Sequence, residues 1–498
     1  MSNLASLYLD RAARRPEARF GVVEEPTTLA QAVSTARSGT GQLARAGVEA
    51  GSRAAVIGDT GTSYLIAFLT LQLAGVETAL VNPALPDDLI QHMLDNLKVS
   101  TVLWINRDPS PEVAPDALQL DASDCASGQL QSDGGVLSGF GEEALEGLAR
   151  RPQDIAGYMH TSGTTGPPKF CAQSHHYFLS LGRFIADSMS ISPADTVFAP
   201  LPMFHINPLG YGVMGALTAG ADVLGTRRFS ASRFWPKVRE SGTTVVFLHG
   251  PPVAILNKAT RSEDAAGHQL RCVFLADGPF LEKFQVPMAY SGYGSTEAGG
   301  LTHIWPWHLG DRCEHPEGMS RYGGRVRKEM EWDLTRDGEI LIRSTEDHVL
   351  SSGYQTGDGR IDLISQDGWF HTGDLGRRDE AGRMIFIERR SESIRVKGEF
   401  VPITYVERVF SEIEAVGEIA LWRRAGELGD HEVVLYVVSE SSLPRQEILG
   451  RSEALASFMR PSAVIRIDSM PRTEGAQKIS RRDLSGRKVL ESFEMSRA

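Results

Sequence analysis

A short run of small and hydroxyl-bearing residues ends in a lysine about a third of the way along the chain. Its chemically active members are Thr161, Ser162, Gly163, Thr164, Thr165, Gly166 and Lys169. Glycines allow a backbone to approach phosphate oxygens closely, hydroxyls donate hydrogen bonds to those oxygens, and a lysine adds positive charge. A surface turn is the ordinary alternative, but a turn needs neither so many hydroxyls nor the lysine. The run therefore predicts a phosphate-binding loop, although it lacks the Gly-Lys-Ser/Thr triplet of P-loop NTPases.

Four further motifs follow in chain order. They are Tyr293-Gly294-Ser295-Thr296-Glu297, Thr372-Gly373-Asp374, the segment from Arg389 to Gly398, and Pro471-Arg472-Thr473 with Lys478. Their carboxylates suit hydroxyl groups or a cation, and their lysine and arginine suit phosphate. Together with the loop, these motifs resemble those of the adenylate-forming superfamily, which includes acyl-CoA synthetases, carrier-loading adenylation domains and firefly luciferase. The resemblance covers nearly the whole chain.

The resemblance implies a nucleotide site built from the second and third motifs. Glu297 is the expected magnesium ligand and Thr296 a donor to the α-phosphate of ATP. Asp374 is expected to accept hydrogen bonds from both ribose hydroxyls, a task suited to a two-oxygen acceptor. Arg389 is expected to contact the ribose or the phosphates. The adenine is expected to lie between the ring of Tyr293, with Gly294 and Ser295 beside it, and a wall that contains Asp277 and Gly278.

The resemblance also implies a catalytic lysine and a hinge. Lys478 is expected to bridge the carboxylate and the α-phosphate, where two anions meet and an ammonium group is needed. Ser391 stands at the expected pivot, where family members usually carry aspartate or lysine. The lysine motif departs as well, because Gln477 replaces a common glycine. A solvated surface charge is the ordinary alternative for a lysine near the end of a chain.

A substrate pocket is expected around the segment that begins at Pro202. The resemblance implies that His205 gates this pocket, with Ile206 beside it; a histidine satisfied within the core is the alternative. The other expected pocket residues are Gly292, Gly299 and Gly300. Their small size and the apolar neighbours predict a flat aromatic or medium-chain acid.

These roles imply an ATP-dependent acid ligase that forms an acyl-adenylate and then transfers the acyl group. ATP and Mg²⁺ are the expected cofactors, and coenzyme A is the expected second substrate. An amide synthetase that passes the acyl group to a free amine is the alternative. A nucleotide-binding regulator without chemistry is a further alternative, which Lys478, Glu297 and Thr296 argue against.

Alternating apolar and amphipathic stretches must position these residues. Arg53 to Gly58, Thr78 to Val81 and Ser100 to Ile105 are typical of short buried strands, whereas Tyr64 to Gly75 and Asp88 to Leu97 are typical of helices. Such alternation predicts βαβ units and a mostly parallel sheet covered by helices. The fold class is therefore α/β.

The pattern changes further along the chain. Between about Ala114 and Glu146 an Asp/Ser/Gly-rich composition predicts an exposed connection without its own core. Short strands with turn signals from about Gly324 to Glu388 predict a meander or small β-barrel. A helix from Ile403 to Phe410, followed by two strands, predicts a small α+β domain. We expect a large ATP- and acid-binding domain at 1–390 and a small mobile domain at 391–498 that carries the lysine.

The composition excludes several other classes. The 498 residues carry a formal net charge of -12, which argues against a nucleic-acid-binding protein. The four cysteines have no paired spacing, so neither a disulfide framework nor a zinc site is expected. No secretory signal is visible at the start, and the most apolar stretch, Tyr64 to Val81, is interrupted by Gln72 and Glu77. We expect a cytoplasmic protein without a membrane span, monomeric or homodimeric, acting on small molecules.

Overall fold

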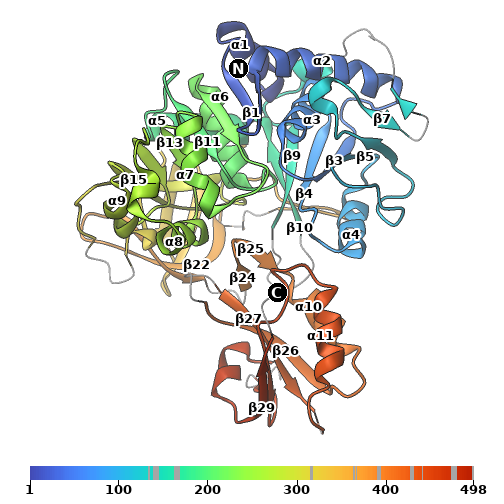
Figure 1. Cartoon of the computed structure of the whole chain (residues 1–498), viewed down its shortest axis with the longest axis vertical. Helices are drawn as coiled ribbons and strands as arrows, with labels where there is room; N and C mark the ends of the chain where they lie inside the picture. The colour runs from blue at the N-terminus through green and yellow to red at the C-terminus, as the bar shows by residue number, and fades with distance from the viewer. Residues whose placement is uncertain are drawn as a thin grey trace. The chain divides into compact units, whose positions relative to one another are not determined.

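The computed structural model of the chain describes residues 1–132, 135–137, 145–161, 169–313, 318–362, 365, 367–389, 394–426, 431–439, 441–472 and 479–495. The chain divides into two compact units, one made mainly of residues 1–388 and the other mainly of residues 389–498. In Figure 1 the first unit runs from blue to orange and the second unit contains the orange-red strands and helices at the end of the chain.

Two large sheets form the first unit. Within the described residues the first sheet has 13 strands and the second has 10. In sheet order, the first contains β18 (Met330–Leu334), β19 (Glu339–Ser344), β22 (Phe370–Arg378), β23 (Met384–Arg389), β17 (Tyr322–Val326), β16 (Gly300–His308), β15 (Met288–Ser295), β14 (Cys272–Phe274), β13 (Val245–Phe247), β11 (Thr196–Ala199), β12 (Asp222–Gly225), β1 (Arg19–Val22) and β2 (Glu25–Thr28). The second contains β21 (Gly359–Ile361), β20 (Tyr354–Thr356), β10 (Lys169–Ser174), β9 (Ile155–Thr161), β4 (Glu77–Val81), β3 (Arg53–Gly58), β5 (Thr101–Ile105), β6 (Leu118–Asp121), β7 (Gln131–Ser132) and β8 (Gly135–Val136).

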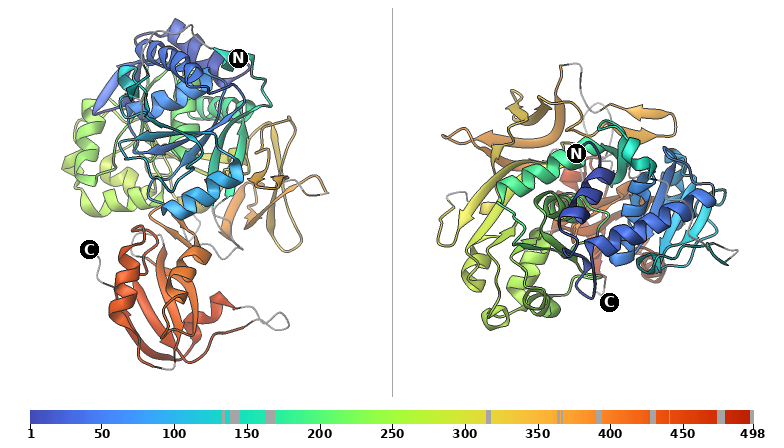
Figure 2. Two further views of the ribbon diagram at one scale, coloured as in Figure 1. Left: turned by 90° about the vertical axis from the view of Figure 1, so that its right-hand side faces the viewer. Right: turned by 90° about the horizontal axis from the view of Figure 1, so that it is seen from above.

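Helices cover both faces of the first sheet. The helices of this unit are α1 (Leu4–Arg14), α2 (Leu29–Arg45), α3 (Thr62–Leu73), α4 (Asp87–Leu97), α5 (His175–Ser188), α6 (Met214–Ala219), α7 (Ala231–Glu240), α8 (Gly250–Ala259) and α9 (Gly278–Phe284). Side chains of α7, α8 and α9 pack together on one face of β11 to β15, and these three helices lie side by side in Figures 1 and 2. The opposite face packs with α5 and α6 into a larger core shared with the second sheet.

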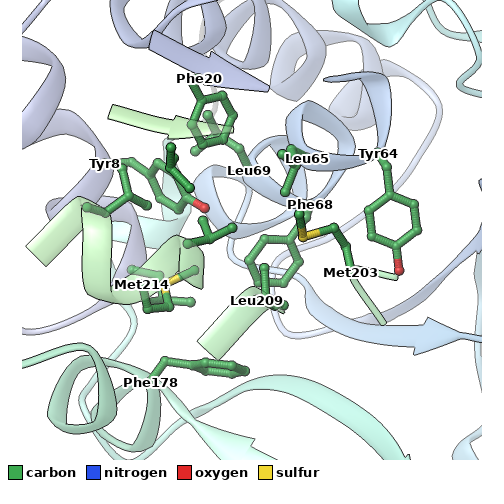
Figure 3. Close-up of a cluster of buried hydrophobic side chains, with 14 of the residues drawn as sticks. Tyr8, Phe20, Tyr64, Leu65, Phe68, Leu69, Phe178, Met203, Leu209 and Met214 are labelled. Atoms are coloured by element: carbon green, nitrogen blue, oxygen red, sulfur yellow. The ribbon is translucent and has the colours of Figure 1, made fainter. Parts of the chain in front are cut away.

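Helix α3 lies at the centre of that larger core. Every one of its residues is buried, and apolar side chains lie on all sides of it, as expected of a helix between two layers. Figure 3 shows Leu65, Phe68 and Leu69 of α3 among side chains from distant parts of the chain, such as Tyr8 and Phe20. The parallel pairing of β3 with β4 and β5 confirms the alternation that the sequence predicts for this region. No helix in the described ranges is both long and apolar enough to cross a membrane.

The prediction for the segment from Ala114 to Glu146 is partly wrong. Strand β6 extends the second sheet by pairing in parallel with β5. Leu120, Cys125 and Leu130 are buried and belong to the main core. The sequence prediction missed them because the alternation of Leu118, Leu120 and Ala122 is short and is followed by a stretch rich in Asp, Ser and Gly.

Strands β15, β16, β17 and β23 pair antiparallel in turn, and so do β18, β19 and β22, as the meander prediction for Gly324 to Glu388 requires. Their pairing shifts register within β15–β16 and again between β17 and β23. Register irregularities of this kind increase local twist and bend a sheet. This half of the first sheet therefore curls.

The second unit is a small α+β body. A four-stranded sheet has the order β26 (Glu418–Ala425), β27 (His431–Val438), β28 (Ala463–Ile467) and β29 (Val489–Glu494), and a separate pair consists of β24 (Ile394–Val396) and β25 (Glu399–Val401). Helix α10 (Ile403–Ser411) contacts β26 and α11 (Arg445–Glu453). The predicted helix and strands in this region are confirmed. Whether this unit is a mobile domain bounded at residue 390 stays a prediction.

Candidate active site

Two residues of separate motifs meet on the curled half of the first sheet. The hydroxyl of Tyr293 donates a 2.8 Å hydrogen bond to Oδ2 of Asp374, and both side chains are buried. The Tyr293 ring stacks on Phe386 at a centroid distance of 5.9 Å. The backbone that presents Asp374 is held by Thr372, whose Oγ1 accepts from the Asp374 amide at 3.1 Å. The structure therefore brings together Tyr293 and Asp374, two of the residues predicted to hold adenine and ribose.

A β-bulge follows Tyr293. The pairing of β15 with β16 shifts register between Tyr293 and Gly294, and a Cβ on Gly294 would lie 1.9 Å from the carbonyl oxygen of Gly300. Only glycine permits so close an approach of two backbones. The bulge ends β15 at Ser295 and starts the turn that carries the predicted phosphate and metal ligands.

Two tyrosines hold Thr296 and Glu297. The hydroxyl of Tyr177 donates to the carbonyl oxygen of Thr296 at 2.9 Å, and the hydroxyl of Tyr354 donates to Oε1 of Glu297 at 2.8 Å. The amide of Ser351 donates to the carbonyl oxygen of Glu297 at 3.0 Å. These bonds leave both motif residues half-buried rather than on a free loop.

Tyr177 reaches Thr296 because its helix begins where strand β10 ends. Ser174 caps α5, and its Oγ accepts from the Tyr177 amide at 3.0 Å. Burial raises the pKa of Tyr177 well above its usual value, so its phenol keeps the proton that it donates. The helix cap at Ser174 thus fixes the Tyr177 hydroxyl where it donates to the second motif.

Glu297 fits the magnesium ion that the resemblance implies. Magnesium is usually held by one or two carboxylates together with phosphate oxygens and water, not by a protein cage. Within the described residues, no group of three or more His, Cys, Asp or Glu side chains could hold a metal ion. One oriented carboxylate, together with the phosphates of ATP, fits the donor set that Mg²⁺ usually takes.

The predicted acid pocket centres on a π-helical segment. His205 lies just before residues Asn207–Val213, which form this segment, and π-helical turns often mark functional sites. The His205 ring contacts Phe204 at a centroid distance of 4.6 Å and His160 at 6.3 Å. Ile206 packs close to Gly210, where a Cβ would meet its Cδ1 at 2.6 Å.

The three predicted pocket glycines face different neighbours. A Cβ on Gly300 would meet Leu181 at 2.6 Å and Tyr211 at 3.3 Å, whereas one on Gly292 would meet Leu301 at 2.7 Å. A Cβ on Gly299 would meet Met330 at 2.6 Å. Gly299 and Gly300 both have left-handed φ angles, of +82° and +81°. The structure thus places these glycines against apolar side chains.

Asp277 caps a helix. Its Oδ1 accepts from the Phe280 amide at 2.9 Å and from Asn257 Nδ2 at 3.3 Å, so it is the N-cap of α9. The aspartate at this position therefore has a structural role as a helix cap. Gly278 follows as the first residue of the helix.

The AMP-binding enzyme family matches residues 9–354 of the chain. The chain belongs to the AMP-binding enzyme family. The matched residues include the predicted phosphate loop, the second motif and the predicted acid pocket. Membership of the adenylate-forming superfamily and the prediction of an ATP-dependent acid ligase are confirmed.

Several proteins are similar to this AMP-binding enzyme. A 2-succinylbenzoate–CoA ligase of Bacillus cereus is 23% identical over 494 residues, covering 97% of this chain and 98% of that protein. A medium/long-chain fatty-acid–CoA ligase of Mycobacterium tuberculosis is 25% identical over 467 residues, covering 84% of this chain and 74% of that protein.

The fold is also that of a solved CoA synthetase. A double mutant of o-succinylbenzoate CoA synthetase from Bacillus subtilis, bound to a product analogue, matches with a TM-score of 0.81 and 23% identity, covering 98% of this chain and 99% of that one. The same enzyme in complex with ATP and a magnesium ion matches with a TM-score of 0.67 and 22% identity, covering 97% and 99%. The predicted α/β fold class is confirmed.

Some predicted residues of this AMP-binding enzyme lie outside the described residues. They are Ser162, Gly163, Thr164, Thr165, Gly166, Ser391 and Lys478, and the side chains of Thr161 and Arg389. Lys169 begins strand β10 and is half-buried. The roles of all these residues stay predictions.

Sequence analysis missed the two tyrosines that hold the second motif. Tyr177 lies 119 positions from Thr296, and Tyr354 lies 57 positions from Glu297. A tyrosine beside a glycine, as in Gly353-Tyr354, was the available signal, but its partner cannot be read from local spacing. The pairing depends on strand β20 lying beside β10.

Proposed function

We propose that this chain activates an apolar carboxylic acid with ATP as an acyl-adenylate and then transfers the acyl group to coenzyme A. The observation that carries this proposal is the convergence of motif residues from separate strands. Tyr293 contacts Asp374 at 2.8 Å, and Glu297, four positions after Tyr293, is oriented by Tyr354 at 2.8 Å. We propose that these three side chains serve the adenine, the ribose and the metal, and their contacts support this because they link strands β15, β20 and β22.

The first half-reaction joins two anions. An oxygen of the acid attacks the α-phosphorus of ATP, a new P–O bond forms, and pyrophosphate leaves with the electron pair of the broken bond. Glu297 would hold Mg²⁺, which supplies charge neutralisation for the phosphates and orients the leaving group. Thr296 donates to the α-phosphate and Lys478 supplies the ammonium between the two anions, as preorganised charges do in such sites.

The nucleotide is held by several parts of the chain. Asp374 accepts hydrogen bonds from the ribose hydroxyls. The hydroxyl of Tyr293 holds the Asp374 carboxylate in place, and the Tyr293 ring stacks on the adenine. The loop from Thr161 to Lys169 cradles the outer phosphates with backbone amides and hydroxyls. Arg389 adds a charge at the ribose or phosphates.

The acid is aromatic or of medium length. Apolar side chains, including Leu181, Tyr211 and Leu301, surround the glycines of the predicted pocket. His205 stands at its edge, against Phe204. Relatives named for 2-succinylbenzoate and for medium- and long-chain fatty acids support this range.

The second half-reaction forms a thioester. The thiol of coenzyme A attacks the acyl carbonyl, a C–S bond forms, AMP leaves with the electron pair, and the thiol proton is released. Coenzyme A is supported as acceptor because the relatives that match most of the chain are named as CoA ligases. We further propose that residues 1–390 bind ATP and acid, and that residues 391–498 carry Lys478 and rotate at Ser391 between the two half-reactions.

Two measurements test the proposal. Acid-dependent exchange of labelled pyrophosphate into ATP, run with benzoate, 2-succinylbenzoate and octanoate, should show at least one acid well above the acid-free background. Product analysis with the best acid should then yield an acyl-CoA. Exchange without thioester, but with amide when amines are supplied, would replace coenzyme A by an amine; no exchange with any acid would overturn the function.

A further inference from the structure

A fully buried arginine lies between strands β17 and β18. The Arg327 side chain has no exposed surface, and its Nη2 lies 2.7 Å from Oε1 of Glu329, whose side chain is 8% exposed. Charges are rarely buried to this extent unless they are paired and hydrogen-bonded. Sequence analysis singled out neither residue, because Arg327 lies in a charged run, 325–329, that is typical of a solvated loop.

The Arg327 guanidinium joins the turn after the second motif to helix α5. Its Nη1 donates to the carbonyl oxygens of Gly299 at 3.1 Å and Leu301 at 3.3 Å. Its Nη2 donates to Oγ of Ser180 at 2.6 Å. One planar cation thus holds the backbone on both sides of Gly300 and ties it to the helix whose Leu181 packs against Gly300.

The turn needs such a restraint. Gly299 and Gly300 are consecutive and both adopt left-handed φ angles, and glycine restricts the backbone less than any other residue. Gly299 follows Glu297 by two positions, and Gly300 packs against Tyr211 of the predicted acid pocket. Any shift of the turn would therefore displace both the metal ligand and the pocket wall.

Stability alone does not explain the pair. Replacing a buried ion pair by apolar residues of similar size is often neutral or stabilising. Oε2 of Glu329 is buried and has no hydrogen-bond partner among the described residues, so the pair leaves one acceptor unmet. Burial raises the pKa of Glu329, but the Arg327 guanidinium outweighs burial and lowers it, so the carboxyl stays ionised beside the cation.

We propose that Arg327 is a positioning residue that, held by Glu329 and Ser180, fixes the segment Gly299–Leu301, where the turn after the second motif enters β16, and so sets the acid pocket and the orientation of Glu297. This inference rests on the proposed function for its link to the acid, but its link to the turn is independent of it. The group acts through backbone carbonyls and does not touch the reacting atoms.

The test uses the double variant Arg327→Met with Glu329→Met, which removes both charges and keeps their volume. Arg271→Met with Asp195→Leu is the matched control, because that pair is 2.7 Å apart and Arg271 likewise donates to the carbonyl oxygens of Met189 and Ser190, which lie in another part of the chain. Both variants are compared with the wild type in melting temperature, hydrogen–deuterium exchange, and kinetics with the acid and with ATP.

In the Arg327/Glu329 variant we expect a melting temperature near that of the wild type and faster exchange confined to the amides of residues 298–302. We also expect a roughly 10- to 100-fold fall in kcat/KM for the acid, as small misplacements of binding groups produce. The control variant should change neither the exchange at residues 298–302 nor kcat/KM for the acid. Arg327→Lys keeps the charge but loses the planar fork. Its kcat/KM for the acid and its exchange at residues 298–302 should lie between those of the wild type and the double variant.

The outcomes separate the two proposals. Unchanged exchange at 298–302 in the folded double variant would overturn the positioning role, as would unchanged kcat/KM for the acid. Faster exchange throughout the chain would overturn it as well, because the pair would then serve general stability. If the wild type activates no acid, the proposed function fails, but localised exchange at 298–302 would still establish the role of Arg327 in the turn.

Discussion

Tyr293 and Asp374 are joined by a 2.8 Å hydrogen bond although three strands, β23, β17 and β16, lie between their own strands in the sheet. In a flat sheet four strand spacings would hold them roughly 19 Å apart. Only the curling of this half of the sheet brings the two side chains into contact. The nucleotide site that we propose therefore depends on sheet curvature as much as on the motif residues.

Asp374→Ala should weaken ATP binding because the ribose hydroxyls lose their two-oxygen acceptor. Unmet hydrogen bonds in a closed site cost roughly 1–3 kcal/mol, or about 5- to 150-fold in Kd by calorimetry. Tyr293→Phe should weaken binding less. Tyr322→Phe is the control, since Tyr322 makes a similar 2.7 Å bond to Asp379. Unchanged ATP affinity in Asp374→Ala would show that Asp374 does not bind the ribose.

Tyr354→Phe should raise the concentration of Mg²⁺ needed for pyrophosphate exchange. The phenol orients Glu297 through a 2.8 Å hydrogen bond, and loss of such an outer partner typically costs about 10- to 100-fold in metal affinity or activity. Tyr158→Phe removes a comparable 2.6 Å bond to Glu77 and serves as control. A Mg²⁺ dependence equal to that of the wild type would contradict the assignment of Glu297.

Lys478→Ala should abolish most adenylate formation while the fold survives. Removing a preorganised charge of this kind costs on the order of 10²–10³ in rate. Lys488→Ala, which changes an exposed lysine nearby in sequence, should be silent. Near-normal pyrophosphate exchange in a well-folded Lys478→Ala protein would remove this lysine from the mechanism.

Ser391→Pro should impair acyl transfer far more than adenylation. Proline fixes φ near -65° and removes a backbone donor, so it opposes the rotation that we propose at this position. Pyrophosphate exchange and transfer from a chemically made acyl-adenylate are measured separately, with Ser391→Gly as the permissive control. Equal losses in both reactions, without unfolding, would mean that Ser391 is not the pivot.

Stability should fall below about pH 6.5 because of a buried neutral histidine. His175 accepts from the Leu4 amide through Nδ1, and burial, with the nearby Arg150, lowers its pKa to about 4. Between pH 6.5 and 4 the unfolded chain binds a proton that the folded chain does not, so stability is present above pH 6.5 and is lost as the pH falls. At pH 5 the loss is about 2 kcal/mol.

Melting temperatures at pH 7.5 and 5.0 measure this effect. His175→Asn keeps an acceptor for the Leu4 amide but cannot titrate, so its melting temperature should fall less between the two pH values than that of the wild type. His308→Asn, at an exposed position, should behave as the wild type. An equal fall in the wild type and in His175→Asn would assign the acid sensitivity to other groups.

The sequence by itself determined the family, the α/β class and the positions of the motifs. Each motif is short, and its chemistry resides in adjacent residues, such as Thr296 beside Glu297. The βαβ alternation from Arg53 to Ile105 was equally legible, because buried strands and helices leave periodic apolar patterns in the chain.

Only the tertiary structure decided which residues hold those motifs in place. Asp277 became a helix cap, Tyr354 the partner of Glu297, and Arg327 the support of the segment Gly299–Leu301. Such pairings depend on strand order, register and sheet curvature, which arise from contacts between residues far apart in the chain. A buried arginine and a solvated one look alike in a sequence, because burial is a property of the packed fold.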